Sequence, residues 1–336
     1  MNNNIAISYS TDDRYAQHLS ASLASLLVNA NGDEQIDIFI LNNGSLSNFH
    51  KRRIKVLERL RKHSTIDFLT IDDTAFEELP LTGLPIETYY RFAVPQLLKE
   101  YSRAIYLDCD TIIEGDIANL ASVDFGGKYI AAVPDILGKE FKEHINVKDR
   151  EFVYCNAGVL LFNLEAIRRD SVDKLLFENA DKYSDLIRLG DQDIINITMA
   201  QLDGFKHLGY EWNLGHTTKF VSKEMLKPAM ANPQIIHFMG RVKPWDYGCK
   251  QTLRAKYWRY LKYTEYRGYA IEYRLINPLL GRLKQLKRFI FRTNKNYVKQ
   301  KRTVYFLFIP IYRRYWRDEY VRHYICGIPI YWRRKK

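Results

Sequence analysis

The feature that most constrains the fold is an alternation of short apolar segments with amphipathic helical patterns near the start of the chain. The apolar segments, which predict strands, are residues 4–9, 36–41, 65–70 and 103–107. The clearest helical pattern lies between the first two, with Leu19, Leu23 and Leu26 at three- and four-residue spacing. Strands that alternate with helices predict an α/β fold with a mixed, mainly parallel sheet covered on both faces.

Two further helices are predicted to begin near Ser47 and Thr88. Ligands bind parallel sheets outside the carboxyl ends of the strands. Asp12 follows the first predicted strand and Asp108 follows the fourth, so both are expected at that edge. Later in the chain the patterns predict strands over 129–133, 159–163 and 235–238, and helices over 172–183 and 192–202.

The net charge of +12 is distributed unevenly along the chain. Residues 251–336 contain 23 Lys and Arg against 4 Asp and Glu, a net charge of +19. Subtraction from the totals of 51 and 39 leaves 28 against 35 in residues 1–250, a net charge of −7. The sequence therefore predicts one acidic globular domain over 1–250 and a basic, aromatic C-terminal extension over 251–336.

The positive charge of the extension has three possible explanations. Lys and Arg can bind anionic headgroups while Trp258, Trp316 and Trp332 lie at a membrane interface. The same residues can bind the phosphates and stack on the bases of a nucleic acid, or they can form a basic subdomain with no anionic partner. The membrane is the favoured partner, and a nucleic acid is the least favoured.

A weak internal repeat also lies in the extension. The segment from Tyr305 to Tyr312, with Ile-Pro-Ile before the second tyrosine, recurs nineteen residues later from Tyr324 to Tyr331. Two copies are too few for a solenoid. They predict two similar hairpin arms or two segments that lie in an interface.

Two absences set the expected location. The first residues are polar with no apolar stretch behind them, and no apolar run reaches the roughly 18 to 20 residues of a membrane span. The four cysteines are scattered without a CxxC pair, which favours a reducing compartment. The expected location is therefore cytoplasmic, peripheral on the inner face of the membrane.

Four polar segments are candidates for chemistry. In the first, Asp108 and Asp110 flank Cys109 after an apolar strand, and two carboxylates so placed can hold a hard divalent ion. In the second, His237 ends a short strand and is followed by Gly240 and Lys243, which suit a metal and a phosphate. The other two are Asp191-Gln192-Asp193 at a helix start and a predicted Asn156-Ala157-Gly158 turn.

The order of these segments resembles glycosyltransferase family 8, which contains bacterial lipooligosaccharide galactosyltransferases and glucosyltransferases, and glycogenin. The matching segments are residues 10–15, 88–91, 108–110, 156–158, 191–193 and 237–245, so that the resemblance covers about residues 4–250. It implies a GT-A fold with one nucleotide-binding domain, a UDP-sugar donor, Mn²⁺ or alternatively Mg²⁺, and retention of anomeric configuration. The extension also resembles the basic, aromatic C-terminal segment of bacterial members.

The resemblance also implies roles for individual residues. The implied metal ligands are Asp108, Asp110 and His237. The implied donor-binding residues are Ser10, Asp12, Arg14 (often Asn in the family) and Tyr15 for uracil and ribose, Arg91 and Asn156 near the sugar, and Gly240 and Lys243 for the diphosphate. The implied catalytic residues are Asp135 and Asp191, which hold sugar hydroxyls, and Gln192 at the reacting face.

The predicted activity is transfer of galactose or glucose from a UDP-sugar to a saccharide such as a lipooligosaccharide, a lipopolysaccharide or another cell-surface glycan. Because an amide is a poor nucleophile, Gln192 favours same-face attack over the covalent intermediate of retaining glycosidases, with its amide oxygen stabilising the ring cation. Two alternatives stay open: a nucleotidyltransferase, which also uses paired Asp and Mg²⁺, and a catalytically degenerate protein that binds a sugar or a surface.

Overall fold

The structure is a computed structural model. It describes residues 4–80, 82–135, 137–147, 149, 151–215, 223–246, 249–273, 291–296, 301–306, 309–317, 320–325 and 328–334. The chain divides into two compact units, Met1–Ala270 and Ile271–Lys336, which are described in turn.

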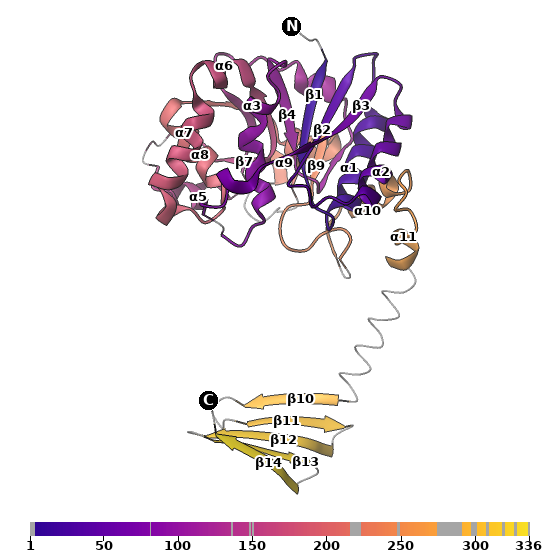
Figure 1. Cartoon of the computed structure of the whole chain (residues 1–336), viewed down its shortest axis with the longest axis vertical. Helices are drawn as coiled ribbons and strands as arrows, with labels where there is room; N and C mark the ends of the chain where they lie inside the picture. The colour runs from indigo at the N-terminus through magenta and orange to yellow at the C-terminus, as the bar shows by residue number, and fades with distance from the viewer. Residues whose placement is uncertain are drawn as a thin grey trace. The chain divides into compact units, whose positions relative to one another are not determined.

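A seven-stranded sheet forms the centre of the first unit (Figure 1), in the order β3-β2-β1-β4-β7-β6-β8. The strands are β1 (Ile5–Ser10), β2 (Ile36–Asn42), β3 (Ser64–Thr70), β4 (Arg103–Leu107), β6 (Ile130–Pro134), β7 (Cys155–Asn163) and β8 (Phe205–His207). Only β7 runs antiparallel to its neighbours, and the other adjacent pairs are parallel. The prediction of a mixed, mainly parallel α/β sheet is confirmed.

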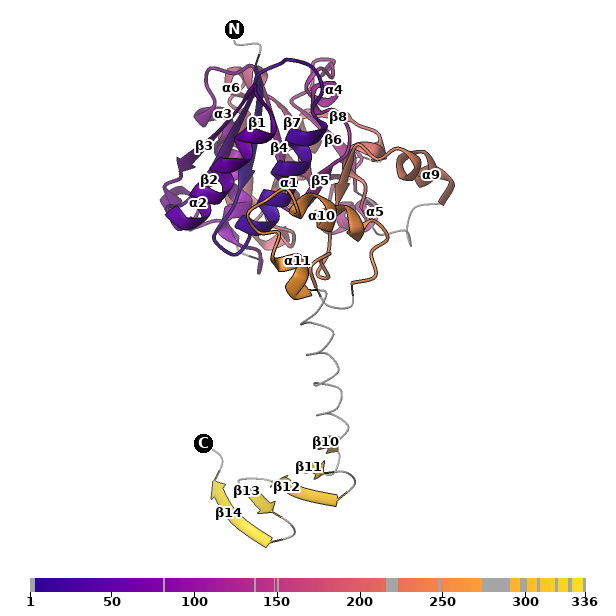
Figure 2. The ribbon, with the colours of Figure 1, turned by 90° about the vertical axis from the view of Figure 1, so that its right-hand side faces the viewer.

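Helices cover both faces of this sheet, as Figures 1 and 2 show. One face carries α1 (Ala16–Asn29), α2 (Asn48–Lys55) and α10 (Arg254–Leu261), and the other carries α3 (Val94–Leu97), α6 (Leu164–Arg169), α7 (Val172–Lys182) and α8 (Asp191–Leu202). The shorter helices are α4 (Ile117–Ala121), α5 (Gly138–His144), α9 (Lys223–Ala231) and α11 (Tyr269–Ile271). The helix predicted over 16–27 thus exists, because Leu19, Leu23 and Leu26 are fully buried against the sheet.

Two local predictions were wrong. The helix expected near Thr88 is instead a 3-10 helix, Ile86–Ala93, followed by the single turn of α3. Pro95 occupies the first turn of α3, and because its ring excludes it from a helix interior, one long helix cannot pass through it. Asn156 to Gly158 form no turn, since they lie within β7. The Gly158 carbonyl accepts from the Asp108 amide at 2.9 Å, whereas the Ala157 amide donates to a side chain, at Gln192 Oε1.

A second, two-stranded sheet connects distant parts of the chain. It pairs β5 (Thr111–Ile113) antiparallel with β9 (Ile235–His237), and Thr111 lies opposite His237. Where β9 ends and β5 begins, the Phe238 amide donates to the Asp110 carbonyl at 3.0 Å. This small sheet therefore fixes the start of β5 beside the end of β9, at the carboxyl edge of the main sheet.

The first unit continues to Ala270, beyond the boundary predicted at residue 250. Helix α10 packs on α1, and Tyr257, Trp258 and Tyr260 are buried. The Trp258 indole donates to the Pro244 carbonyl at 3.2 Å. The prediction that Trp258 lies at a membrane interface was therefore wrong, because its ring belongs to the core of the first unit.

The second unit contains a five-stranded antiparallel sheet in the sequential order β10 to β14. Its strands are β10 (Phe291–Asn296), β11 (Lys301–Phe306), β12 (Ile309–Arg317), β13 (Tyr320–Ile325) and β14 (Ile328–Arg334). The repeat forms two equivalent hairpins, because Tyr305 pairs with Pro310 and Tyr324 pairs with Pro329, each beside a register shift. The hairpin alternative thus describes the backbone. Among the described residues of both units, no helix is long and apolar enough to span a bilayer.

Candidate active site

Three potential metal ligands converge at the carboxyl edge of the main sheet. Asp108 directly follows β4, Asp110 directly precedes β5, and His237 ends β9. One ligand atom from each lies within 4.8 Å of the others. The His237 Nε2 is 3.2 Å from Asp110 Oδ1 and 3.7 Å from Asp108 Oδ2. Two carboxylates and an imidazole form a donor set that fits a divalent cation such as Mn²⁺.

The His237 ring is oriented by an amide. Its Nδ1 lies 2.9 Å from Asn213 Oδ1, and the Asn213 Nδ2 donates to Asn156 Oδ1 at 2.8 Å. Since the Asn213 oxygen can only accept, Nδ1 carries a ring proton, and Nε2 is the nitrogen that faces the carboxylates. Asn213 therefore holds His237 in the orientation in which Nε2 can ligate a metal.

The cluster fits because Gly158 has no side chain. A Cβ at this position of β7 would lie 2.1 Å from His237 Cε1 and 2.8 Å from Asp108 Oδ2. Both distances are far below contact distance. Gly158 therefore matters for the space it leaves rather than for a turn.

Two cations neutralise the carboxylates from opposite sides. Lys243 Nζ donates to Asp110 and, at 3.0 Å, to the Phe238 carbonyl. The buried Arg91 donates to Asp108 Oδ1 at 3.0 Å and pairs through Nε with Asp191 Oδ2 at 3.1 Å. Burial alone would raise the pKa of Asp110, but Lys243 and His237 outweigh it and hold that pKa below its ordinary value.

A cleft of about 570 Å³ opens beside this cluster. Its lining comes from the loop after β1, the 3-10 segment before α3, the metal cluster and Lys243. The residues are Ser10, Thr11, Asp12, Arg14, Tyr15, Gly83, Leu84, Pro85, Glu87, Thr88, Tyr106, Asp108, Cys109, Asp110 and Lys243. The volume suits a ligand of nucleotide-sugar size.

A network of amide groups and one carboxylate adjoins the cluster. Gln192 Oε1 accepts from the Ala157 amide at 3.0 Å and from Asn156 Nδ2 at 3.1 Å. Because the Ala157 N–H can only donate, it fixes which end of the Gln192 amide is the oxygen. Asp135 Oδ2 accepts from Asn156 at 2.9 Å and from Gln192 Nε2 at 3.3 Å. These three predicted residues therefore lie together at the carboxyl edge.

Asp191 lies between this network and the metal cluster. It is the first residue of α8, yet its carboxylate pairs with Arg91, and the N-cap position belongs to Gly190. Burial raises the pKa of Asp191 to about 6, although the Arg91 guanidinium opposes the shift.

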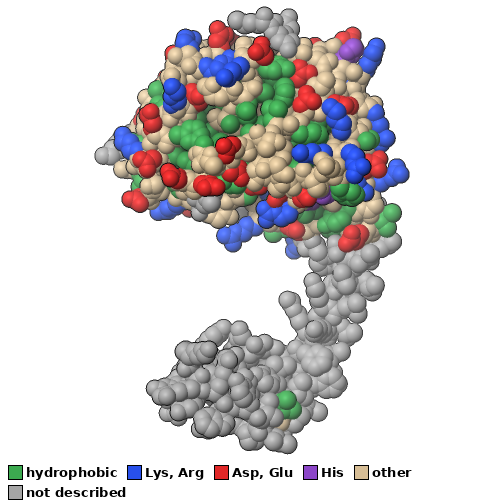
Figure 3. Space-filling model, in the orientation of Figure 1, with side chains coloured by type: hydrophobic (Ala, Val, Ile, Leu, Met, Phe, Trp, Pro, Cys, Tyr) green, Lys and Arg blue, Asp and Glu red, His purple; other side chains and the backbone are tan. Residues whose placement is uncertain are grey.

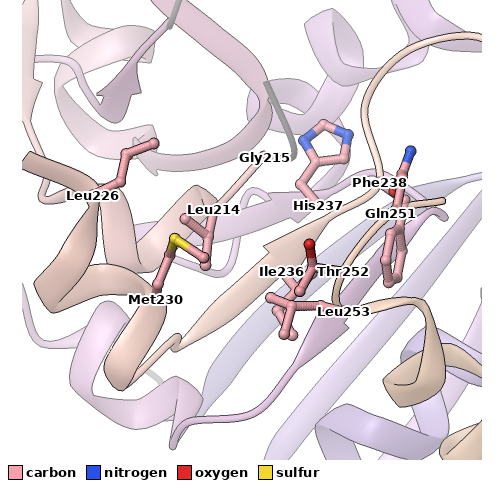
Figure 4. A pocket seen from close by; sticks show the side chains of 10 residues that line it. All are labelled: Leu214, Gly215, Leu226, Met230, Ile236, His237, Phe238, Gln251, Thr252 and Leu253. Atoms are coloured by element: carbon pink, nitrogen blue, oxygen red, sulfur yellow. The ribbon is translucent and has the colours of Figure 1, made fainter. Parts of the chain in front are cut away.

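A second pocket, of about 30 Å³, lies beside His237 (Figure 4). Most of its lining residues are apolar, and the polar ones are His237, Gln251 and Thr252. It has room for about one water and holds no carboxylate, so the chemistry belongs to the larger cleft.

The comparisons with known proteins agree with this geometry. The family model of glycosyl transferase family 8 matches residues 6–249, which is more than half of the chain. The chain belongs to glycosyltransferase family 8. The predicted resemblance is thereby confirmed, and the chain is a member of a family of transferases.

Curated relatives and solved structures of this family resemble the chain. General stress protein A of Bacillus subtilis is 29% identical over 76% of this chain and 92% of its own length. Lipopolysaccharide 1,2-glucosyltransferase of Escherichia coli is 25% identical over 71% of this chain and 72% of its own length. The structure of galactosyltransferase LgtC with donor and acceptor sugar analogues has a TM-score of 0.68, at 23% identity over 79% of this chain and all of that one. The GT-A fold is thus confirmed.

The family 8 resemblance identified residues that the structure does bring together, with two qualifications. Arg14 is mostly exposed and pairs with Asp12, so it lies at the rim of the cleft. Gly240 lies in the exposed loop after β9 with φ +85°, a conformation that favours glycine.

Sequence reasoning missed the residues that support the predicted ones. Asn213 orients His237, and Tyr154 donates to the fully buried Asp193 at 2.6 Å while its hydroxyl lies 3.3 Å from Gln192 Nε2. His144 lies 2.9 Å from the same Asp193 carboxylate. Tyr154 stands two residues before the matched segment at 156–158, and this proximity is the one signal that could have drawn attention to it.

Proposed function

We propose that this chain is a retaining hexosyltransferase that moves galactose or glucose from a UDP-sugar to the saccharide of a cell-surface glycan, such as a lipooligosaccharide or lipopolysaccharide. The observation that carries the proposal is the convergence of Asp108, Asp110 and His237 beside a nucleotide-sized cleft. The relatives named as a lipopolysaccharide glucosyltransferase and a galactosyltransferase support a hexose donor and a glycan acceptor.

The metal ligands in this proposal are Asp108, Asp110 and His237, and the preferred ion is Mn²⁺. A nitrogen ligand favours Mn²⁺ over Mg²⁺, which prefers oxygen alone. When bound, the ion supplies positive charge to the diphosphate of the donor.

Lys243 supplies a second positive charge in the cleft. Burial alone would lower its pKa, but the Asp110 carboxylate more than offsets this and raises it, so the ammonium is protonated at neutral pH. Its charge stabilises the negative charge that develops on the departing diphosphate. Gly240, which has no side chain, lets a phosphate approach the backbone of the same loop.

The loop after β1 binds the uracil and ribose. Asp12 is held in place because its Oδ1 accepts from the Tyr15 amide at 3.0 Å. The Tyr15 ring contacts Trp245 edge to face, with ring centroids 6.1 Å apart, and so offers a fixed aromatic surface for the base. Ser10 and Arg14 line the cleft on either side of this pair.

Asp135 and Asp191 hold the sugar hydroxyls in this proposal. Arg91 and Asn156 lie near the donor sugar. Arg91 pairs with both Asp108 and Asp191, so it fixes the position of the sugar-binding carboxylate relative to the metal cluster. Asn156 likewise joins Asp135 to Gln192. A misplaced sugar would therefore disturb the ion pairs of Arg91 and the hydrogen bonds of Asn156.

Gln192 faces the reacting sugar without acting as a nucleophile. Both lone pairs of its Oε1 already accept N–H groups, from Asn156 and from Ala157. This supports same-face attack, in which a leaving-phosphate oxygen takes the acceptor's proton and no bond forms to Gln192. Because both acceptor positions are in use, Gln192 Oε1 can stabilise a ring cation only while it keeps accepting these hydrogen bonds. A covalent sugar trapped on Gln192 or Asp191 of the wild-type enzyme would contradict this mechanism.

Release of UDP from UDP-galactose and UDP-glucose tests the function, with and without Mn²⁺. We expect Mn²⁺-dependent release that a chelator abolishes, and a loss of about 10²- to 10³-fold in Asp110→Asn, as for removal of one electrostatic group from a developing charge. Asp185→Asn is the matched control, because Asp185 is exposed and far along the chain from the cluster.

The outcome separates this proposal from its rivals. A nucleotidyltransferase would release pyrophosphate from a nucleoside triphosphate rather than UDP from UDP-sugars. A degenerate binding protein would bind UDP-sugar without turnover. Absence of UDP-sugar turnover in the wild type would overturn the main proposal.

We also propose that the basic extension holds the enzyme at the anionic inner surface of a membrane, beside a lipid-linked acceptor. Its 23 cationic residues against 4 acidic ones support this, and a nucleic acid is the less favoured partner. Since residues 251–270 belong to the first unit, flotation with anionic liposomes should compare the full chain with a chain ending at Ala270. Equal flotation of both would contradict a membrane role for the second unit.

A further inference from the structure

One side of the acidic first unit is strongly basic. Residues 48–63, which form α2 and the 3-10 turn Val56–Leu60, contain seven Lys and Arg against one Glu. The rest of residues 1–250 therefore contains 21 Lys and Arg against 34 Asp and Glu, a net charge of −13. Figure 3 shows Lys and Arg gathered on the right-hand edge of this unit, whereas Asp and Glu gather at its lower left.

Helix α2 and the 3-10 turn after it expose a row of alternating cationic and apolar side chains. Ile54 and Leu57 face the core, whereas Phe49, Arg52, Val56 and Arg59 recur at three- and four-residue spacing and are exposed. Phe49 is 51% exposed and Val56 is 38% exposed. Large apolar side chains are thus exposed to water between cations, along α2 and the 3-10 turn that follows it.

A distant segment continues this surface. The His50 Nδ1 lies 2.5 Å from the Tyr266 hydroxyl, and the Arg53 guanidinium lies over the Tyr266 ring, 5.1 Å from its centroid. Residues 262–267 therefore border α2, and they add exposed Lys262, Tyr263 and Arg267. We call the exposed side chains of 49–62 and 262–267 together the α2 face.

Much of the charge on the α2 face is uncompensated. Lys55 pairs with Glu58 at 2.9 Å, and Arg59 approaches Glu265 at 3.8 Å. Arg52, Lys62, Lys262 and Arg267 have no carboxylate of the described residues within 4.0 Å. Four such cations on one surface repel each other. An anionic partner that covers them would reduce this repulsion, which favours its binding.

We propose that the α2 face is a membrane-docking surface of the first unit, with a bilayer of anionic phospholipid as its partner. A bilayer binds exposed cations at its headgroups and takes up apolar side chains such as Phe49 and Val56 between them. A single-stranded nucleic acid would reward an aromatic stack but gains little from an exposed valine. This surface belongs to the first unit, and the proposal stands even if residues 271–336 bind no lipid.

Docking on this face also orients the cleft. The amide of Ser47, the N-cap residue of α2, donates to Asp13 Oδ1 at 2.7 Å. Asp13 adjoins Asp12, which lines the cleft. A bilayer on the α2 face would therefore lie next to the loop after β1, at the rim of the cleft to which the uracil and ribose are assigned.

Two variants of the full chain in which cations are replaced by neutral glutamine test the proposal. One lies in residues 49–62 and the other in residues 262–267. They are the triple variant Arg52→Gln, Arg59→Gln, Lys62→Gln and the double variant Lys262→Gln, Arg267→Gln. The matched control is the triple variant Lys139→Gln, Lys174→Gln, Lys227→Gln, whose residues are exposed on α5, α7 and α9. In Figure 1, α5 and α7 lie at the opposite side of the first unit from α2.

Binding is measured by flotation with vesicles of phosphatidylglycerol and phosphatidylcholine, and with phosphatidylcholine alone. A cation near an anionic bilayer contributes about fivefold to binding, so the α2 triple variant should bind roughly 10²-fold more weakly and the double variant roughly 20-fold more weakly. The control should bind as the wild type, and the unfolding midpoint and UDP release of all variants should be unchanged. Phe49→Ser should weaken binding with little change in its salt dependence.

The other outcomes overturn the proposal. Variants that bind anionic vesicles as tightly as the wild type would exclude the α2 face, as would an equal loss in the control. A loss of binding to a DNA oligonucleotide without any loss on vesicles would assign the face to nucleic acid. A wild type that binds neither kind of vesicle would exclude the membrane altogether.

Discussion

The two sides of the candidate site are built on different physical principles. On the metal side, Asp108, Asp110 and His237 are held by charge, with Lys243 and Arg91 as counter-ions. On the sugar side, Asp135, Asn156 and Gln192 are held by hydrogen bonds in which amide groups predominate. Charge attracts a diphosphate over a distance, whereas an amide network selects the orientation of hydroxyls. The metal side should therefore control donor affinity, and the sugar side should control turnover.

Substitution of Gly158 should break the metal side most severely and have the largest effect. In Gly158→Ala, the new Cβ would displace His237 or Asp108, so we expect roughly 10²-fold weaker Mn²⁺ binding and a matching loss of UDP release. Mn²⁺ titration by electron paramagnetic resonance measures the affinity. Gly268→Ala is the control, because nothing lies within 4 Å of a Cβ there. Wild-type Mn²⁺ affinity in Gly158→Ala would place the metal elsewhere.

Asn213→Ala should weaken the metal side more than the sugar side, to which it is joined by one hydrogen bond to Asn156. Loss of the oriented Nδ1 hydrogen bond should lower Mn²⁺ affinity by about 10- to 100-fold. Saturating Mn²⁺ should then restore most of the turnover, which a misfolded variant could not do. Asn232→Ala, at an exposed position, serves as the control. A loss of turnover that saturating Mn²⁺ leaves unchanged would show that Asn213 acts on the sugar side instead.

Asp191 joins the two sides, and its protonation should appear in stability. The raised pKa, about 6, means that the folded chain binds this proton more tightly than the unfolded chain does. The contribution of Asp191 to the free energy of unfolding is therefore present at pH 4 and is lost as the pH rises through 6. Relative to Asp191→Asn, the wild type should lose about 2 kcal/mol between these values. Urea unfolding at several pH values measures it, and a flat difference between the wild type and Asp191→Asn would refute it.

Tyr154→Phe should have the smallest effect and should act on turnover alone. It removes the hydroxyl shared by the buried Asp193 and Gln192, which should cost about 1 kcal/mol of stability and about tenfold in kcat. Mn²⁺ affinity should not change. Tyr129→Phe is matched to it, because its hydroxyl also donates to an aspartate, at the exposed Asp170. A changed Mn²⁺ affinity in Tyr154→Phe would show that the two sides are not separable.

The sequence predicted much of the fold because its strands and helices carry local signals. Leu19, Leu23 and Leu26 show the helical period, and the buried strand before Asp108 is continuously apolar. Trp258 carries no such signal. Its position depends on α10 packing against α1, which is a contact between residues far apart in sequence. Aromatic residues in a basic segment look alike whether they are buried or exposed.

The candidate site divides in the same way. The metal ligands and Gln192 could be predicted because their segments match a family pattern. Asn213 and His144 could not, since each acts through one hydrogen bond to a residue that is distant in the chain. Gly158 was identified for the wrong reason, because a glycine beside an asparagine suggests a turn, whereas in this chain it makes room for an imidazole.

The pairing of β5 with β9 has a further consequence for stability. Asp110 and His237 are 127 positions apart (237 − 110), and β5 and β9 bring them together only in the folded chain. An ion held by both would act as a removable cross-link across that span. Closing a loop of this length costs the unfolded chain about 4 kcal/mol of entropy, so the ion would bind the folded form almost exclusively. The melting temperature should then rise with the logarithm of Mn²⁺ concentration even without a donor sugar, and depletion of the ion would threaten the lifetime of the protein as well as its turnover.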